Sequence, residues 1–132
     1  MDTATFVVTP HYLATGQGPS GIALRSGGSE LYVADVQNNQ FSVLSLPGFT
    51  EATYPLSNTP TGAAVKPAGD YAYISQNTGN SVSAVNTFSK AVTGPVAVGS
   101  GPQGLAITPG GKHVYVANYG ANTVSVVYTN GY

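Results

Sequence analysis

Cysteine and tryptophan are both absent from this sequence of 132 residues, and no long apolar run occurs in it. Without cysteine the chain can form no disulfide and carry out no thiol chemistry. No stretch approaches the roughly 18 consecutive apolar residues that a membrane-spanning helix needs. Residues 1–10 lack the basic start of a secretory signal peptide, so we expect none in this stretch.

Charge is also scarce. Only 7% of the residues are charged and the net charge is −1, whereas about 25% is typical of soluble domains. With no basic stripe, we expect no nucleic-acid partner. A polar surface built from Ser, Thr, Asn and Gln is common in secreted and surface proteins, so we expect an extracellular or cell-surface location. A net charge near zero does little to oppose self-association.

Three copies of one pattern run through the chain. The segments PSGIAL at 19–24, PTGAAV at 60–65 and PQGLAI at 102–107 are offset by 41 and 42 residues. Each copy continues with a tyrosine segment (YVAD at 32–35, YISQ at 73–76, YVAN at 115–118). An asparagine segment then follows (NQFSVL at 39–44, NSVSAV at 80–85, NTVSVV at 122–127). A period near 40 residues with several short strands per unit is typical of β-propeller blades.

Each unit predicts four antiparallel strands. The first is the four-residue GIAL-type segment. The second covers residues 31–34, 72–75 and 114–117, and the third covers 40–46, 81–86 and 123–128. The fourth covers 51–56 and 91–98. Because these strands are apolar on both faces, we expect each blade to lie between two neighbours.

The chain is predicted to be a single three-blade unit, 1–132, and the repeat gives the bounds of its blades. Residues 2–15 align with the segment that links the third strand to the end of the fourth, residues 86–98. We therefore predict an isolated fourth strand at 2–15, a first blade at 16–57 and a second at 58–99. A third blade at 100–132 lacks its fourth strand.

The third copy, GPQGLAITPGGKHVYVANYGANTVSVV at 101–127, resembles the YVTN-type β-propeller repeat. That family includes surface-layer-like proteins and is similar to lactonase-like propellers. The resemblance extends over the whole chain, with looser matches in the first two copies. It implies an all-β fold of four-stranded propeller blades, three in this chain. It does not imply one function, because this fold hosts many unrelated activities.

A propeller needs about four to eight blades to close, so we expect the ring to be completed by other chains. Two chains would form a six-bladed ring, and a head-to-tail contact that does not close would form a filament. In both, the strand at 2–15 would complete the last blade of another copy. The residues predicted to make this contact are Phe6, Val7, Val8, Tyr12, Leu13, Val124, Val126 and Tyr128.

Two repeated positions are candidate ligand-binding sites at the rim of a central channel. Arg25, Lys66 and Thr108 directly follow the innermost strand, where cations could hold a small anion; exposure in a turn is the alternative. Asp35, Gln76 and Asn118 end the second strand. They either line one rim or cap the following turn by binding backbone N–H groups.

No motif in the chain predicts catalysis. The Ser-His-Asp order, the P-loop and the dinucleotide-binding glycine pattern are absent. His11 and His113 have no Asp, Glu or Cys at metal-ligand spacing. We therefore predict no catalytic residue, metal or cofactor, and a non-enzymatic structural protein that assembles with itself. A module that binds a glycan or small anion is the alternative. A lactonase-like enzyme is a third hypothesis, for which the chain is poor in His, Arg and Glu.

Overall fold

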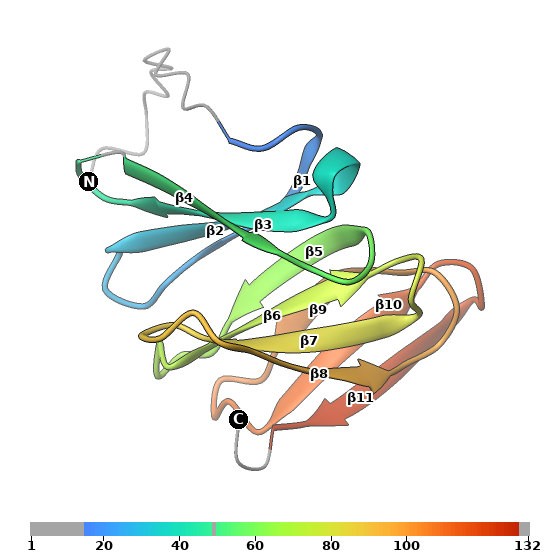
Figure 1. Cartoon of the computed structure of the whole chain (residues 1–132). Coiled ribbons are helices and arrows are strands. Elements are labelled where there is room, and N and C mark those ends of the chain that lie inside the picture. Colours follow the sequence, from blue (N-terminus) through green and yellow to red (C-terminus); the bar gives the residue numbers. More distant parts are fainter. Residues whose placement is uncertain (1–14, 49, 130–132) are drawn as a thin grey trace, which may run out of the picture.

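The computed structural model describes residues 15–48 and 50–129, which form three antiparallel sheets (Figure 1). The predicted strand at 2–15 lies outside these residues, apart from Thr15, and so do Phe6, Val7, Val8, Tyr12 and Leu13. In the described part, no helix is long and apolar enough to cross a membrane.

We call the three sheets blades 1, 2 and 3. Blade 1 holds β1 (Pro19–Leu24), β2 (Glu30–Asp35), β3 (Gln40–Ser45) and β4 (Thr50–Pro55), with a short 3-10 turn at Val36–Asn38. Blade 2 holds β5 (Pro60–Val65), β6 (Tyr71–Gln76), β7 (Ser81–Asn86) and β8 (Val92–Ala97). Blade 3 holds β9 (Pro102–Ile107), β10 (His113–Asn118) and β11 (Thr123–Tyr128). In each blade the strands lie side by side in chain order.

The innermost strands are longer than predicted, with six residues instead of four, because the segment from proline onward also pairs with the second strand. The fourth strands end earlier than predicted, at Pro55 and Ala97. Leu56 and Val98 still donate to the carbonyls of Asn39 and Asn80, and the chain then crosses to the next blade.

Two kinds of turn, between the first and second strands and between the second and third strands, recur in all three blades. In the turns after β1, β5 and β9, a glycine at positive φ (Gly28 73°, Gly69 76°, Gly111 69°) closes a bond to the carbonyl three residues earlier. Before each third strand, an asparagine adopts the left-handed conformation (Asn39 48°, Asn80 47°, Asn122 55°). Both conformations suit these residue types, which explains why they recur in the sequence.

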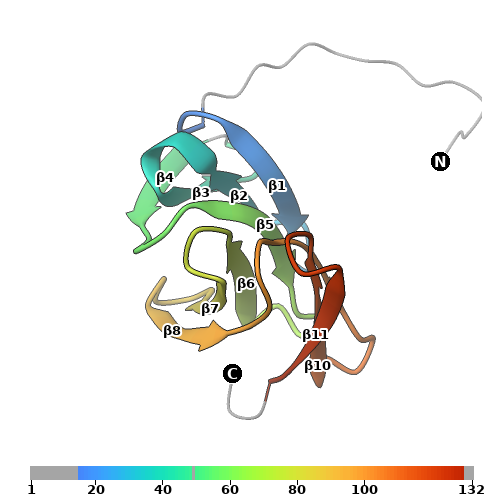
Figure 2. The ribbon, with the colours of Figure 1, turned by 90° about the vertical axis from the view of Figure 1, so that its right-hand side faces the viewer.

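The blades pack face to face, with β5 lying against both β1 and β9 (Figure 2). Between blades 1 and 2 the core consists of Tyr32, Phe41, Val43, Ala72, Ile74 and Val85. Between blades 2 and 3 it consists of Tyr73, Val82, Ala84, Val114 and Val116. Each blade therefore turns its tyrosine face toward the next blade and its aliphatic face toward the previous one.

Close approach of the inner strands makes this packing tight. A Cβ added at Gly21 would lie 2.5 Å from Cα of Gly62, and one at Gly62 would collide with the carbonyl oxygen of Gln103. Real Cβ atoms do not approach backbone this closely, so only glycine fits at these two positions.

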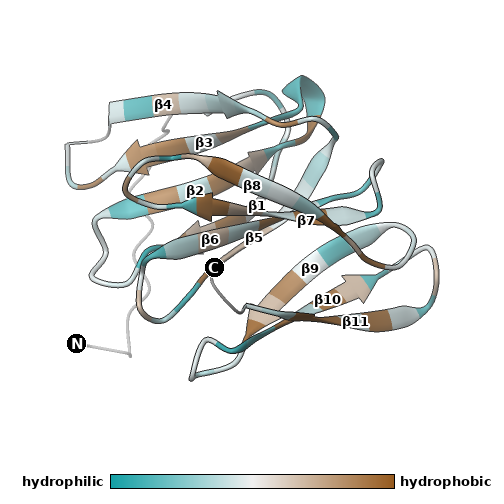
Figure 3. Cartoon of the chain, turned by 60° about the horizontal axis from the view of Figure 1, so that its bottom comes forward, coloured by the Kyte–Doolittle hydropathy of each residue, from teal (hydrophilic) through white to brown (hydrophobic). Residues whose placement is uncertain are grey.

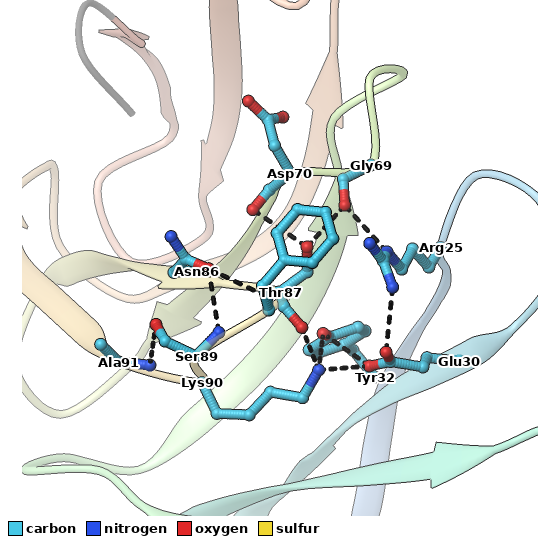
Figure 4. A network of polar contacts seen from close by, with 11 residues as sticks. Arg25, Glu30, Tyr32, Gly69, Asp70, Asn86, Thr87, Ser89, Lys90 and Ala91 are labelled. Carbon is cyan, nitrogen blue, oxygen red and sulfur yellow. Dashed lines mark hydrogen bonds and ion pairs between the residues drawn. The ribbon is translucent and has the colours of Figure 1, made fainter.

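A polar network also joins blades 1 and 2 (Figure 4). Lys90 Nζ of blade 2 lies 2.5 Å from Glu30 Oε2 and 3.1 Å from Tyr32 Oη, and it also donates to the carbonyl of Thr87. Arg25 binds Glu30 Oε1 at 3.0 Å and donates to the carbonyl of Gly69 in blade 2 at 2.9 Å. Glu30 is therefore held by two cations, one from each blade.

This network shifts the titration of Glu30. Burial raises the pKa of its carboxyl, but hydrogen bonds from Lys90 and Tyr32 and the charges of Lys90 and Arg25 outweigh burial. The pKa is thus held below its ordinary value of 4.5. A lowered pKa in the folded state adds stability above the ordinary value, and that stability is lost as the pH falls through the folded value.

We expect Glu30→Gln to destabilise the protein at pH 7, and the difference from wild type to shrink as the pH falls below 4.5. Urea denaturation at pH 7 and pH 3 would measure this. Glu51→Gln is the matched control: this exposed residue accepts one hydrogen bond, from Ser42 at 3.0 Å, which an amide oxygen can also accept, so the substitution should cost less at pH 7. A difference for Glu30→Gln that is equally large at both pH values would contradict this explanation.

Candidate assembly site

Of the three residues predicted at a channel mouth, Arg25 and Lys66 contact the turn of the next blade, whereas Thr108 bonds within its own turn. Arg25, which donates to the carbonyl of Gly69, also lies over the ring of Phe88 at 4.5 Å. Lys66 lies 3.6 Å from the carboxylate of Asp70. The Lys66 stem also lies beside Gly111 in the turn of blade 3. Thr108 accepts bonds from the backbone N–H groups of Lys112 and His113. Arg25 and Lys66 therefore each contact the following blade. Anion binding by these residues stays a prediction.

The three residues predicted at the other rim are buried: Asp35 and Gln76 are 0% exposed and Asn118 is 2% exposed. Each contacts the serine of the third strand: Asp35 with Ser42 at 2.5 Å, Gln76 with Ser83 at 2.5 Å and Asn118 with Ser125 at 2.8 Å.

The same polar residues and serines also bind the backbone of the segment that precedes the first strand of each blade. The backbone N–H of Gly16 donates to Ser42, that of Asn58 to Gln76, and that of Gly99 to Ser125. The arrangement therefore supports neither an open binding rim nor capping of the following turn. Asp35, Gln76 and Asn118, which we call the buried pins, instead take part in the contacts that hold the segment before the first strand of each blade. The sequence pattern did not predict this role.

The outer edge of blade 3 is open. β11 pairs with β10 on one side, and in the described part of the chain no strand pairs with its other side (Figure 3). Val124, Val126 and Tyr128 on this strand are 63%, 45% and 67% exposed. The first two occupy the repeat positions of Phe41 and Val43, which are in the core of blade 1. Exposed apolar residues that form a contiguous patch are typical of interaction surfaces.

A groove of about 430 Å³ runs beside this edge. It is bounded on one side by residues 125–128 of β11 and on the other by the outer edge of blade 2. The blade 2 residues that line it are Tyr73, Val82, Ala84, Thr93, Gly94, Val96, Ala97 and Val98. In blade 2 the fourth strand, β8, lies directly beside β7. The groove of blade 3 has the position and the apolar lining for such a strand.

Blade 1 has an open face at the opposite end of the stack. Ile22 and Leu24 are 63% and 55% exposed. A hollow of about 300 Å³ on this face is lined by Thr15, Pro19, Ser20, Ile22, Leu31, Val33 and Leu44. The sequence analysis did not single out Ile22 or Leu24, and its repeat pattern predicts Tyr115 in the blade core with Tyr32 and Tyr73, whereas Tyr115 is 43% exposed. Their repeat equivalents, Ala63, Val65 and Tyr73, lie between blades, which is the signal that could have revealed them.

No protein-family model matches the chain, and no curated protein matches it by sequence. Its fold does match solved structures. Hydrazine synthase of Kuenenia stuttgartiensis superposes with a TM-score of 0.83 and 25% identity, over 96% of this chain and 37% of that one.

Two further matches are structures of a "putative 6-phosphogluconolactonase". The one from Bacteroides fragilis has a TM-score of 0.75 and 21% identity over 89% of this chain and 36% of that one. The one from Bacteroides uniformis has a TM-score of 0.72 and 20% identity over 87% and 37%. This chain spans little more than a third of each protein. The predicted fold class is confirmed: the chain has an all-β fold that corresponds to part of a β-propeller.

The buried pins predict a stability effect. Gln76→Ala should lower the free energy of unfolding by about 2–4 kcal/mol, because it opens a cavity and leaves Ser83 and the N–H of Asn58 without their partner. Urea denaturation would measure it. Gln37→Ala, on an exposed turn, is the control and should have little effect. Equal effects of the two substitutions would contradict the role of the pins.

Proposed function

We propose that this chain is a non-enzymatic structural module of the YVTN type, which assembles with further copies of itself through β-strand complementation of its blades. The observation that carries the proposal is the open edge of β11, where residues equivalent to core positions are exposed beside an apolar groove.

The physical driving force is the one that forms the inner blades. An added strand would satisfy the unpaired backbone groups of β11. It would also fill the groove lined by Tyr73, Val82 and Val127, and burial of a valine side chain contributes about 1.5–3 kcal/mol when it is complete. Residues 2–15 are the segment that we propose for this strand, because their sequence aligns with the segment that contains β8.

The assembly takes one of two forms, a closed ring of six blades from two chains or an extended filament. A head-to-tail contact gives a ring if its rotation closes and a filament if it does not. The scarcity of charge favours a place outside the cell or on its surface.

No observation favours an enzyme. Three of the four Lys and Arg side chains form ion pairs with carboxylates, and these pairs hold the turns of the blades. The activities named for the solved structures belong to those proteins, which are nearly three times as long as the part they share with this chain.

Peptide complementation tests the proposal. A chain that lacks residues 2–14 should have the mass of a monomer, 13.4 kDa less the deleted segment. It should bind a synthetic peptide of residues 2–15 at one peptide per chain. Calorimetric titration and light scattering would measure both.

The control is the same peptide with Phe6, Val7 and Val8 replaced by serine, which should not bind because it has little apolar surface to bury. Equal binding of the two peptides, or an unchanged association state after the deletion, would contradict strand complementation.

A further inference from the structure

The repeat also indicates how the open face of blade 3 is covered. The faces that meet between blades 1 and 2 recur between blades 2 and 3 with the same positions in contact. Tyr73 and Val82 of blade 2 repeat Tyr32 and Phe41 of blade 1, and both pairs lie against the following blade. The next members of the series are Tyr115 and Val124 in blade 3, which are 43% and 63% exposed.

The receiving face follows the same series. Ala63 and Val65 of blade 2, and Leu105 and Ile107 of blade 3, pack against the preceding blade. Their equivalents in blade 1 are Ile22 and Leu24, which are largely exposed. In the described part of the chain, the stack thus has one open face of each kind, and these two kinds of face already meet twice within it.

Glycine adds an independent observation. Gly21 lies against Gly62, and Gly62 lies against Gln103, at distances that leave no room for a Cβ atom. Gly104 is the third member of this set, yet a Cβ added there would meet no described atom within 4 Å. Gly104 therefore leaves room for an inner strand that would pack against it as β5 packs against β1.

Polar contacts between the inner strands also recur, with a shift of one residue. Ser20 Oγ donates to the carbonyl of Thr61 at 3.1 Å, and its repeat equivalent Thr61 donates through Oγ1 to the carbonyl of Pro102, one repeat position earlier, at 2.8 Å. The Asn80 side chain accepts a bond from the N–H of Gly101 at 3.0 Å. In the next interface, Gln103 would lie beside Pro19 and Ser20, and Asn122 would face Gly18.

We infer that the open face of blade 3 binds the open face of blade 1 of a second copy of this chain, with Gly104 packed against Ser20 and Gly21. This inference rests on the proposed self-assembly and adds its register. It makes the contact heterologous, because different faces of the two copies meet.

The first test uses the full chain with Gly104→Val. This substitution should leave the fold of the single chain intact, since the added atoms enter open space. In the assembly they would collide with the partner's inner strand and weaken association about tenfold or more. Gly110→Val is the matched control, because a Cβ at Gly110 also meets no described atom within 4 Å. Equal association of the two variants by light scattering would overturn the inference.

The second test places a charge on the receiving face of blade 1. Ile22→Glu in the full chain should weaken association about tenfold or more, because this side chain is 63% exposed in the single chain and would be buried against blade 3 of the second copy. Gln37→Glu, on an exposed turn, is the matched control. Equal association of the two variants by light scattering would overturn the inference.

The outcomes separate this inference from strand complementation. If deletion of residues 2–14 leaves association unchanged and Ile22→Glu still weakens it, strand complementation is wrong and the face contact stands. If the deletion abolishes association but Gly104→Val does not weaken it, the face contact is wrong. A monomeric full chain contradicts both.

Discussion

The close approach of the inner strands is the constraint on which the structure depends. Gly21 and Gly62 let β1, β5 and β9 lie nearly in contact, and this spacing brings the larger side chains of successive blades together. With the spacing set, the tyrosine face of one blade meets the aliphatic face of the next. The buried pins at Asp35, Gln76 and Asn118 then fix the entry of each blade.

Blades that pack through one repeated interface leave one unmatched face at each end of the stack. Repeat architectures bury each face against a neighbour, so the two outer faces remain uncovered unless they are capped by polar residues. No polar cap covers them among residues 15–48 and 50–129, where Ile22 is exposed at one end and Val124 at the other. The apolar packing that joins blades within the chain is therefore the interaction that we propose between chains. The ion pairs of Glu30 add to one interface only, because Tyr71 and His113 occupy its place in the other blades.

The sequence predicted the blades well because their signals are local and repeated. Glycine and asparagine turns at fixed offsets defined the strand order, and Thr123–Tyr128 was predicted residue by residue. It did not predict the roles of Asp35, Gln76 and Asn118, because a polar residue at a strand end is compatible with either an exposed rim or a buried pin. The partner of Lys90 could not be predicted either, since Glu30 lies 60 residues away and in another blade.

The molar mass of the full chain in solution, measured by light scattering over a dilution series, tests the central claim most directly. We predict a mass of at least twice the 13.4 kDa of one chain, which falls toward that of a single chain on dilution. A discrete two-chain species would indicate a closed six-bladed ring, and a larger, polydisperse species would indicate a filament. A constant mass of one chain at every concentration would contradict self-assembly.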